Sequence, residues 1–261
     1  MNRPLNERLA KRDALQDRIW LASIWSCLAA FVFFGVFFGL LAGFLPPPGE
    51  SWSSQEVVAF YAENLTGIRL GLIGALFATA LLTPFFTIIS LEMRKIEGDR
   101  PVLAVMQFGW AVIIVAFFQL ICMFWLLASF REGVDADIVR AFNDYGWLVW
   151  TTLIPTTAGQ FILMGVCGFL DVRSEPLWPR WACYANLWLG FTQSGGIVAV
   201  FFKTGPFSWN GILGWWIPTI SFAIIMIVNL VLLHRHLLRE RRQGAQLPTP
   251  GPAQIHGQAA L

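Results

Sequence analysis

Long apolar segments, separated by short polar ones, dominate the pattern along the chain. Six of these segments reach the ~20 apolar residues that a helix needs to cross the hydrocarbon core of a bilayer. The pattern therefore predicts an all-α integral membrane protein, built as a six-helix transmembrane bundle. The predicted spans cover residues 19–45, 67–92, 102–129, 147–170, 180–202 and 210–233.

The fourth predicted span is unusually polar for a membrane helix. Thr152, Thr156 and Gln160 recur at four-residue intervals, which places them on one face of a helix. Lipid offers such side chains no hydrogen-bond partner, so this face should look toward other helices or toward a cavity. Pro155 lies within the same span and frees a backbone carbonyl from the helical ladder.

The second predicted span repeats this polar face around Pro84. Several amides on other spans fall near the same depth, so a shared, uncharged polar chamber is one interpretation. The other is that these side chains bond to neighbouring helices, at ~0.6 kcal/mol per contact. The residues predicted to line the chamber are Thr79, Thr83, Thr87, Gln119, Thr152, Thr156, Gln160, Asn186 and Gln193.

A short amphipathic helix is expected between the first two spans. Ser53 and Glu56 have the spacing of a helix capping box, and apolar residues follow on one side. Such a helix should lie on the outer membrane surface. The segment from Asp137 to Phe142 has a similar order of residue types and predicts a second helix of the same kind.

Two parts of the chain follow the same order of landmarks. An Asn-x-x-Gly motif opens both the second and the fourth span, at Asn64 and at Asn143, and a basic turn with a proline closes both. These landmarks predict a parallel internal repeat of two hairpins, residues 54–133 and 136–205. The alternative is that all such hairpins need acidic lids, basic turns and prolines.

Charge sets the expected orientation. Only 13% of residues are charged, against about 25% in soluble domains. With both termini cytoplasmic, 14 of the 18 Lys and Arg residues lie on the cytoplasmic side, as the positive-inside rule requires. We therefore expect an N-in/C-in protein of the cytoplasmic membrane. Its parts are a cytoplasmic segment (1–18), a transmembrane domain (19–242) and a disordered cytoplasmic tail (243–261).

The charged lead and the long apolar run after it are typical of an uncleaved first span, and not of a signal peptide. The basic residues are dispersed among loops, which gives no indication of nucleic-acid binding. The lipid bilayer is the one partner that composition itself predicts.

Ionisable side chains are absent from the centres of the predicted spans. Proton-coupled transport usually needs a buried acid or histidine there. His234, His236 and His256 all lie in or after the cytoplasmic end of the last span, which excludes an intramembrane bis-histidine haem. No catalytic motif is present. We therefore predict no catalytic residue, no metal site and no cofactor.

Two acid–base pairs flank the predicted cytoplasmic turns. They are Glu92 with Arg94, and Asp171 with Arg173. Each acid could fix its turn by pairing with the other turn's arginine across the bundle. The same pairs could instead bind a lipid headgroup or a partner protein.

Three functions fit these features. The first is binding or passage of an uncharged, largely apolar small molecule through the neutral chamber. The second is a non-catalytic accessory or assembly subunit of a membrane complex. Its docking surface would be the stripe of Gly35, Gly39 and Gly43, which lets a helix of the same chain or of another subunit approach closely. The third is an intramembrane enzyme that depends on a partner or an external cofactor.

Overall fold

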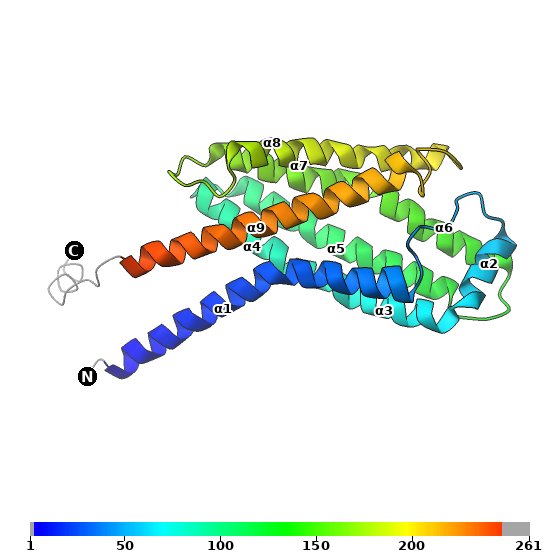
Figure 1. Cartoon of the computed structure of the whole chain (residues 1–261), viewed down its shortest axis with the longest axis horizontal. Helices are drawn as coiled ribbons and strands as arrows, with labels where there is room; N and C mark the ends of the chain where they lie inside the picture. The colour runs from blue at the N-terminus through cyan, green and yellow to red at the C-terminus, as the bar shows by residue number, and fades with distance from the viewer. Residues whose placement is uncertain (1–2, 247–261) are drawn as a thin grey trace.

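A computed structural model describes residues 3–246, and the regular structure of this part of the chain is helical, with no strand (Figure 1). Nearly all of the predicted tail, residues 247–261, lies outside the described residues. The elements in chain order are α1 (Arg3–Phe34), the π-helix η1 (Gly35–Leu41), α2 (Ser54–Glu63), α3 (Leu65–Ala80), α4 (Leu82–Glu97), α5 (Val102–Ala128), α6 (Ala136–Thr152), α7 (Ile154–Leu170), α8 (Arg180–Thr192), the 3₁₀-helix η2 (Gln193–Phe201), the π-helix η3 (Ile212–Trp216) and α9 (Ile217–Gln246).

Five helical stretches of the described chain are long and apolar enough to cross a membrane, which identifies a multi-pass membrane protein. The expected span over residues 180–202 is not among them, because α8 ends at Thr192 and the chain continues as the tighter helix η2. The six-span count is therefore not confirmed. The five stretches are Glu7–Leu41, Leu65–Glu97, Val102–Ala128, Ala136–Leu170 and Ile212–Arg242.

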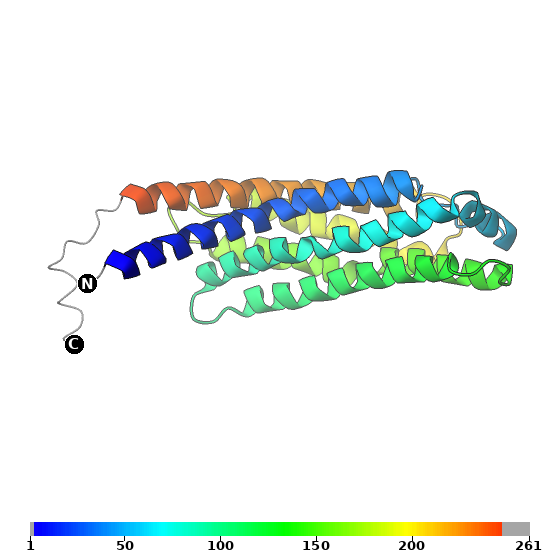
Figure 2. The same cartoon turned by 90° about the horizontal axis from the view of Figure 1, so that it is seen from below.

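Both described ends of the chain lie at the same end of an elongated bundle (Figures 1 and 2). The start of α1 and the end of α9 project beyond the other helices there, and Arg241 Nη2 donates to the carbonyl of Asp17 at 2.8 Å. α1 runs without interruption from Arg3 into the first apolar stretch, and α9 continues through Gln246.

The short helix α2 begins with the predicted capping box, which the structure confirms. Ser53 Oγ accepts from the backbone N–H of Glu56, and the Glu56 carboxylate accepts from the backbone N–H of Ser53. The expected second amphipathic helix is not a separate element, because its residues open α6, which continues to Thr152. The Ser54 hydroxyl donates to Asp137 and so joins α2 to the start of α6.

Prolines interrupt the second and fourth predicted spans at related places. The ring of Pro84 conflicts with the carbonyl of the residue four positions earlier, Ala80, which is where α3 ends. The ring of Pro155 acts in the same way on Thr151, one residue before α6 ends. Each predicted span is therefore two helices in series, α3 with α4 and α6 with α7.

The acids of the two predicted turns, Glu92 and Asp171, do not pair with each other's arginines. Arg173 Nη2 lies 2.7 Å from Asp171 Oδ2, within its own turn, and the backbone N–H of Leu177 donates to the same carboxylate. Burial raises the pKa of Asp171, but the bonds from Arg173 and Leu177 outweigh burial and hold that pKa below its ordinary value. Glu92 pairs with Lys95 at 2.8 Å and not with Arg173.

A hydrogen-bonded chain joins α8 and α9. Trp178 Nε1 donates to Asn229 Oδ1 at 2.6 Å, and Asn229 Nδ2 donates to Asn186 Oδ1 at 3.1 Å. All three side chains are buried. Lipid tails are as apolar as the side chains of the helices, so no hydrophobic driving force brings membrane helices together. Hydrogen bonds between helices therefore help to hold them in contact.

The glycines that let helices approach closely are not those of the predicted stripe. A Cβ at Gly35 or Gly43 would meet nothing within 4 Å, and one at Gly39 would meet the flexible side chain of Leu45. A Cβ at Gly71 of α3 would lie 2.4 Å from the backbone carbonyl oxygen of Phe37 in η1. The backbone of η1 thus packs directly against α3.

We expect Gly71→Ala to lower the free energy of unfolding by about 1–3 kcal/mol, since the added methyl group meets backbone that cannot rotate away. Gly109→Ala on α5 is the matched control, because a Cβ there meets nothing within 4 Å. That variant should be neutral or gain up to about 1 kcal/mol from helix propensity. Denaturant unfolding in detergent, followed by circular dichroism, measures both, and equal effects would contradict the packing described above.

Asn229→Ala should destabilise the protein by about 1–2 kcal/mol, because it leaves the Trp178 N–H and the Asn186 carbonyl buried without a partner. Ile227→Ala, at an exposed position on the same helix, provides the control. The same unfolding assay compares the two variants. A smaller loss for Asn229→Ala than for Ile227→Ala would contradict a role for the hydrogen-bonded chain.

Candidate functional site

A cavity of about 250 Å³ lies among the helices. Its lining is mostly apolar, and none of the described residues that line it is charged. Aromatic rings form much of the wall, and a few hydroxyl and amide groups supply the polar atoms. The aromatic lining residues are Phe31, Phe34, Phe118, Trp150, Trp215 and Phe222, and the polar ones are Thr79, Thr151, Thr157, Gln193 and Thr219.

The cavity lies where helices change their winding. Four such places occur within the apolar stretches, namely α1 to η1, α3 to α4, α6 to α7, and η3 to α9. A fifth occurs where α8 continues as η2. A break in a helix leaves backbone groups without their regular partners, which a membrane tolerates only inside protein or beside a cavity. Every one of the five places contributes lining residues, namely Phe34 and Gly35, Thr79 and Leu82, Thr151 and Leu153, Gln193, and Trp215 and Pro218.

The polar atoms of Gln193 are tied to the start of α9. Its Nε2 donates to the carbonyl of Pro218 at 3.0 Å and to Ser221 Oγ at 2.8 Å. The hydroxyl of Thr79, on the α3 side of a break, donates to the carbonyl of Leu76 at 2.9 Å. These internal hydrogen bonds hold both side chains in place.

Trp215 differs from the other buried tryptophans. Five tryptophan side chains of the described chain are fully buried. The indole N–H of Trp215 has no hydrogen-bond partner among the residues that the structure describes, although the atom is buried. The other four each donate, Trp125 and Trp147 to Asn143, Trp178 to Asn229 and Trp209 to Pro48.

Trp215 also belongs to an aromatic cluster, of which Trp150 and Trp215 itself line the cavity. Its ring centroid lies 5.0 Å from that of Trp150 and 5.2 Å from that of Trp147. Trp147 lies 4.6 Å from Trp125 in turn. These distances fit tilted and edge-on aromatic packing, which holds the rings in defined orientations.

Of the nine residues predicted to line a chamber, Thr79 and Gln193 line this cavity. The other seven lie outside its lining, and the structure therefore does not bring all nine together. The outlying residues are Thr83, Thr87, Gln119, Thr152, Thr156, Gln160 and Asn186.

The helix break at Leu153 explains why the predicted face divides. A four-residue spacing holds one face only on an unbroken helix, and Thr152 and Thr156 lie on opposite sides of the break. Their hydroxyls donate to carbonyls of Leu148 and Leu153, at 2.7 and 3.0 Å. Thr151 and Thr157, adjacent in sequence to the predicted pair, line the cavity in their place.

The remaining predicted residues have different surroundings. Thr83 is exposed, and the Thr87 hydroxyl donates to its carbonyl at 2.9 Å. Gln119 is half-buried. Asn186 belongs to the bonded chain between α8 and α9. Gln160 is buried, and its Nε2 has no partner in the described part of the chain.

Sequence analysis missed Thr151, Thr157, Trp150 and Trp215 as lining residues. The available signal was the run from Gly214 to Pro218, where a glycine and a proline enclose two tryptophans inside an apolar span. Both residues disturb regular helix, and irregular helix in a membrane frequently marks a functional site.

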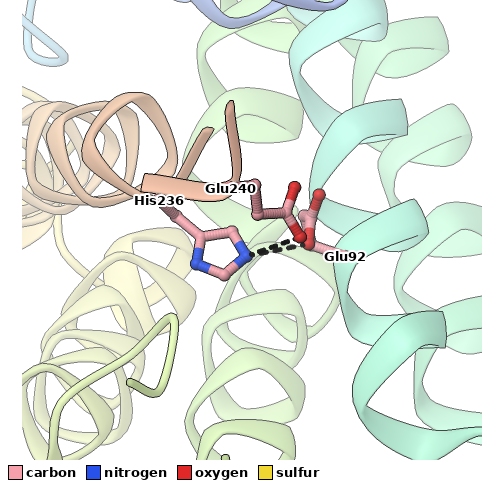
Figure 3. A group of neighbouring side chains, drawn as sticks. All are labelled: Glu92, His236 and Glu240. Atoms are coloured by element: carbon pink, nitrogen blue, oxygen red, sulfur yellow. Dashed lines mark ion pairs between the residues drawn. The ribbon is translucent and has the colours of Figure 1, made fainter. Parts of the chain in front are cut away.

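A second group of functional side chains lies near the end of the bundle that holds both described chain ends. Glu92, His236 and Glu240 each offer one ligand atom, and these atoms all lie within 4.8 Å of one another (Figure 3). Sequence analysis predicted no metal site, because it could not place α4 beside the end of α9. The three residues have the donor types that could hold a metal ion.

Comparisons of the chain with protein-family models, with curated proteins and with solved structures found no match. Function must therefore be inferred from the cavity and from the side chains that surround it.

Proposed function

We propose that this chain binds an uncharged, largely apolar small molecule in the cavity, with an acceptor oxygen of the ligand on Trp215 Nε1. Two observations carry this proposal: the lining of the cavity is uncharged, and one lining residue, Trp215, has a buried indole N–H without a partner in the described chain. A buried donor left unpaired costs about 1–3 kcal/mol. A ligand oxygen would recover that free energy.

Size and charge narrow the class of ligand. Pockets for drug-sized ligands measure about 300–1,000 Å³, so a cavity of about 250 Å³ suits a smaller molecule. A charged ligand would lose its hydration without finding an opposite charge. A ketone, ether or alcohol with an apolar body fits both conditions.

We extend the proposal from binding of the ligand to its passage through the bundle. Transporters often place their substrate site where membrane helices are discontinuous, and five changes of winding surround this cavity. α8 and η2 would form a sixth crossing. At ~1.5 Å per α-helical and ~2.0 Å per 3₁₀ residue, Arg180–Phe201 extends ~37 Å, which exceeds the ~30 Å hydrocarbon core.

The proposed topology is N-in/C-in in the cytoplasmic membrane, with two parallel repeated hairpins. Similar breaks support the repeat, because Leu81 precedes Pro84 by three residues and Leu153 precedes Pro155 by two. The excess of Lys and Arg on one side supports the orientation.

A role as an accessory subunit is the second candidate. The space beside the exposed Gly43, where an added Cβ would meet nothing within 4 Å, supports the approach of another subunit. That role does not use the indole N–H of Trp215, so ligand binding separates the two candidates.

Trp215→Phe should weaken binding of a ketone by about tenfold, the equivalent of one hydrogen bond of about 1.4 kcal/mol. Binding of an alkane of equal length should not change, because the phenyl ring keeps the apolar wall. A medium-chain ketone and the matching alkane, each with a diazirine group, would be photolysed on the purified protein. Mass spectrometry then maps and quantifies the labelled residues.

Trp188→Phe is the matched control, since Trp188 is 71% exposed on α8 and is not a lining residue. It should label as the original protein does. Equal ketone labelling in Trp215→Phe and Trp188→Phe would overturn the assignment of the donor, and labelling confined to lipid-facing residues would overturn the site.

Ala78→Leu should reduce labelling by both probes, because Ala78 is buried and lines the cavity. The larger side chain would occupy the space of the ligand. Ala80→Leu is two residues away at an exposed position and should have no effect. Melting temperatures of both variants separate a filled cavity from a lost fold.

A further inference from the structure

Glu92, His236 and Glu240 meet where long side chains of α4 and α9 reach one another. His236 and Glu240 are one helical turn apart on α9, so both face the same side of the helix. Glu92 reaches them from α4. Figure 3 shows the imidazole Nε2 directed at both carboxylates, at 3.5 Å from Glu92 Oε2 and 3.4 Å from Glu240 Oε1.

Two buried atoms of this group lack a hydrogen bond. Glu92 Oε2 and His236 Nε2 have no hydrogen-bond partner among the described residues, and their side chains are 2% and 9% exposed. A charge-assisted N–H···O bond would measure about 2.7–2.9 Å, which is shorter than the 3.5 Å between them. Unpaired polar atoms at this depth cost free energy, so each needs a partner.

The spacing fits a shared metal ion. Zn²⁺ binds histidine nitrogen and carboxylate oxygen at about 2.0–2.2 Å in tetrahedral geometry, which sets neighbouring ligand atoms about 3.3–3.6 Å apart. The two nitrogen–oxygen distances, 3.5 and 3.4 Å, lie within that interval. One ion bound between the three side chains would therefore give both atoms a partner.

The donor types select the class of ion. An imidazole with two carboxylates suits zinc and the neighbouring transition metals, whereas Ca²⁺ and Mg²⁺ prefer oxygen ligands alone. Three protein ligands leave a fourth position for water. Glu240 is 39% exposed, which gives an ion access from solvent.

We propose that Glu92, His236 and Glu240 form a binding site for one divalent transition-metal ion of the zinc type. The ion fastens α9 to α4 near the end of the bundle that holds both described chain ends. The site is separate from the cavity, because none of the three residues lines it. A result that disproves the metal site would therefore leave the proposed ligand binding in the cavity untouched, and the reverse also holds.

Lys95 is the competing cation of this group. Its Nζ lies 2.8 Å from Glu92 Oε1 and 3.2 Å from Glu240 Oε1. The ammonium group neutralises part of the negative charge and repels a metal ion at close range. Without a metal, the group is an ion-pair network that joins the same two helices.

Calorimetric titration with Zn²⁺ tests the proposal on the full chain, purified without a histidine tag and freed of metal by a chelator. One Zn²⁺ should bind at the group, and Mg²⁺ should not replace it. His236→Ala should weaken Zn²⁺ binding by at least about 100-fold. Even residues that only hydrogen-bond to a metal ligand contribute 10- to 100-fold to metal affinity. His234→Ala is the matched control, because His234 packs against the ring of Trp25 and lies outside the group.

Glu92→Gln provides a second ligand variant that keeps the size of the side chain. It should also lose Zn²⁺ binding, and it secures the test if His236→Ala does not fold. Equal Zn²⁺ affinity in His236→Ala, Glu92→Gln and His234→Ala would overturn the proposal, as would the absence of Zn²⁺ binding by the original chain.

Lys95→Met separates a metal site from an ion-pair network. The proposal expects tighter Zn²⁺ binding, by severalfold, because a repelling charge is removed. It also expects Zn²⁺ to raise the melting temperature of this variant. If the group only pairs ions, Lys95→Met lowers the melting temperature and Zn²⁺ has no effect on it, a result that would contradict the proposal.

Discussion

A backbone N–H or C=O group that leaves the helical ladder inside a bilayer must find another partner, because lipid supplies none. This constraint organises the described bundle. Pro84 and Pro155 free backbone carbonyls in two of the stretches. In three other places a π-helix or a 3₁₀-helix replaces α-helix. All five changes of winding gather around one cavity. The changes of winding within the bundle thus share one region of the fold.

The aromatic cluster gives that region its chemical character. Trp125, Trp147 and Trp215 pack ring against ring, and the first two satisfy their indole N–H groups on Asn143. Trp215 keeps its donor unpaired within the described chain. Tryptophan combines a large apolar surface with one polar atom. Of these three, Trp215 alone lines the cavity, and the ligand proposed above uses both parts of its side chain.

The apolar pattern predicted the class of fold well, because membrane helices are selected by length and hydrophobicity alone. The capping box at Ser53 was also predictable, since it depends on residues three positions apart. The stretch that contains Pro155 shows what sequence alone could not predict. Pro155 is visible in the sequence, but the turn it imposes decides that Thr151 and Thr157 line the cavity while Thr152 and Thr156 do not. Contacts between distant segments, such as Glu92 with His236, have no local signal at all.

The nine residues of η2 have a mechanical consequence. A 3₁₀-helix rises ~2.0 Å per residue, whereas an α-helix rises ~1.5 Å, so η2 is about 4–5 Å longer than the same residues would be as α-helix. Its hydrogen bonds are also poorer than those of an α-helix. Rewinding η2 would draw its far end inward and rotate it by about half a turn around the axis. Gln193, at the fixed end beside the cavity, would then be the pivot of that motion.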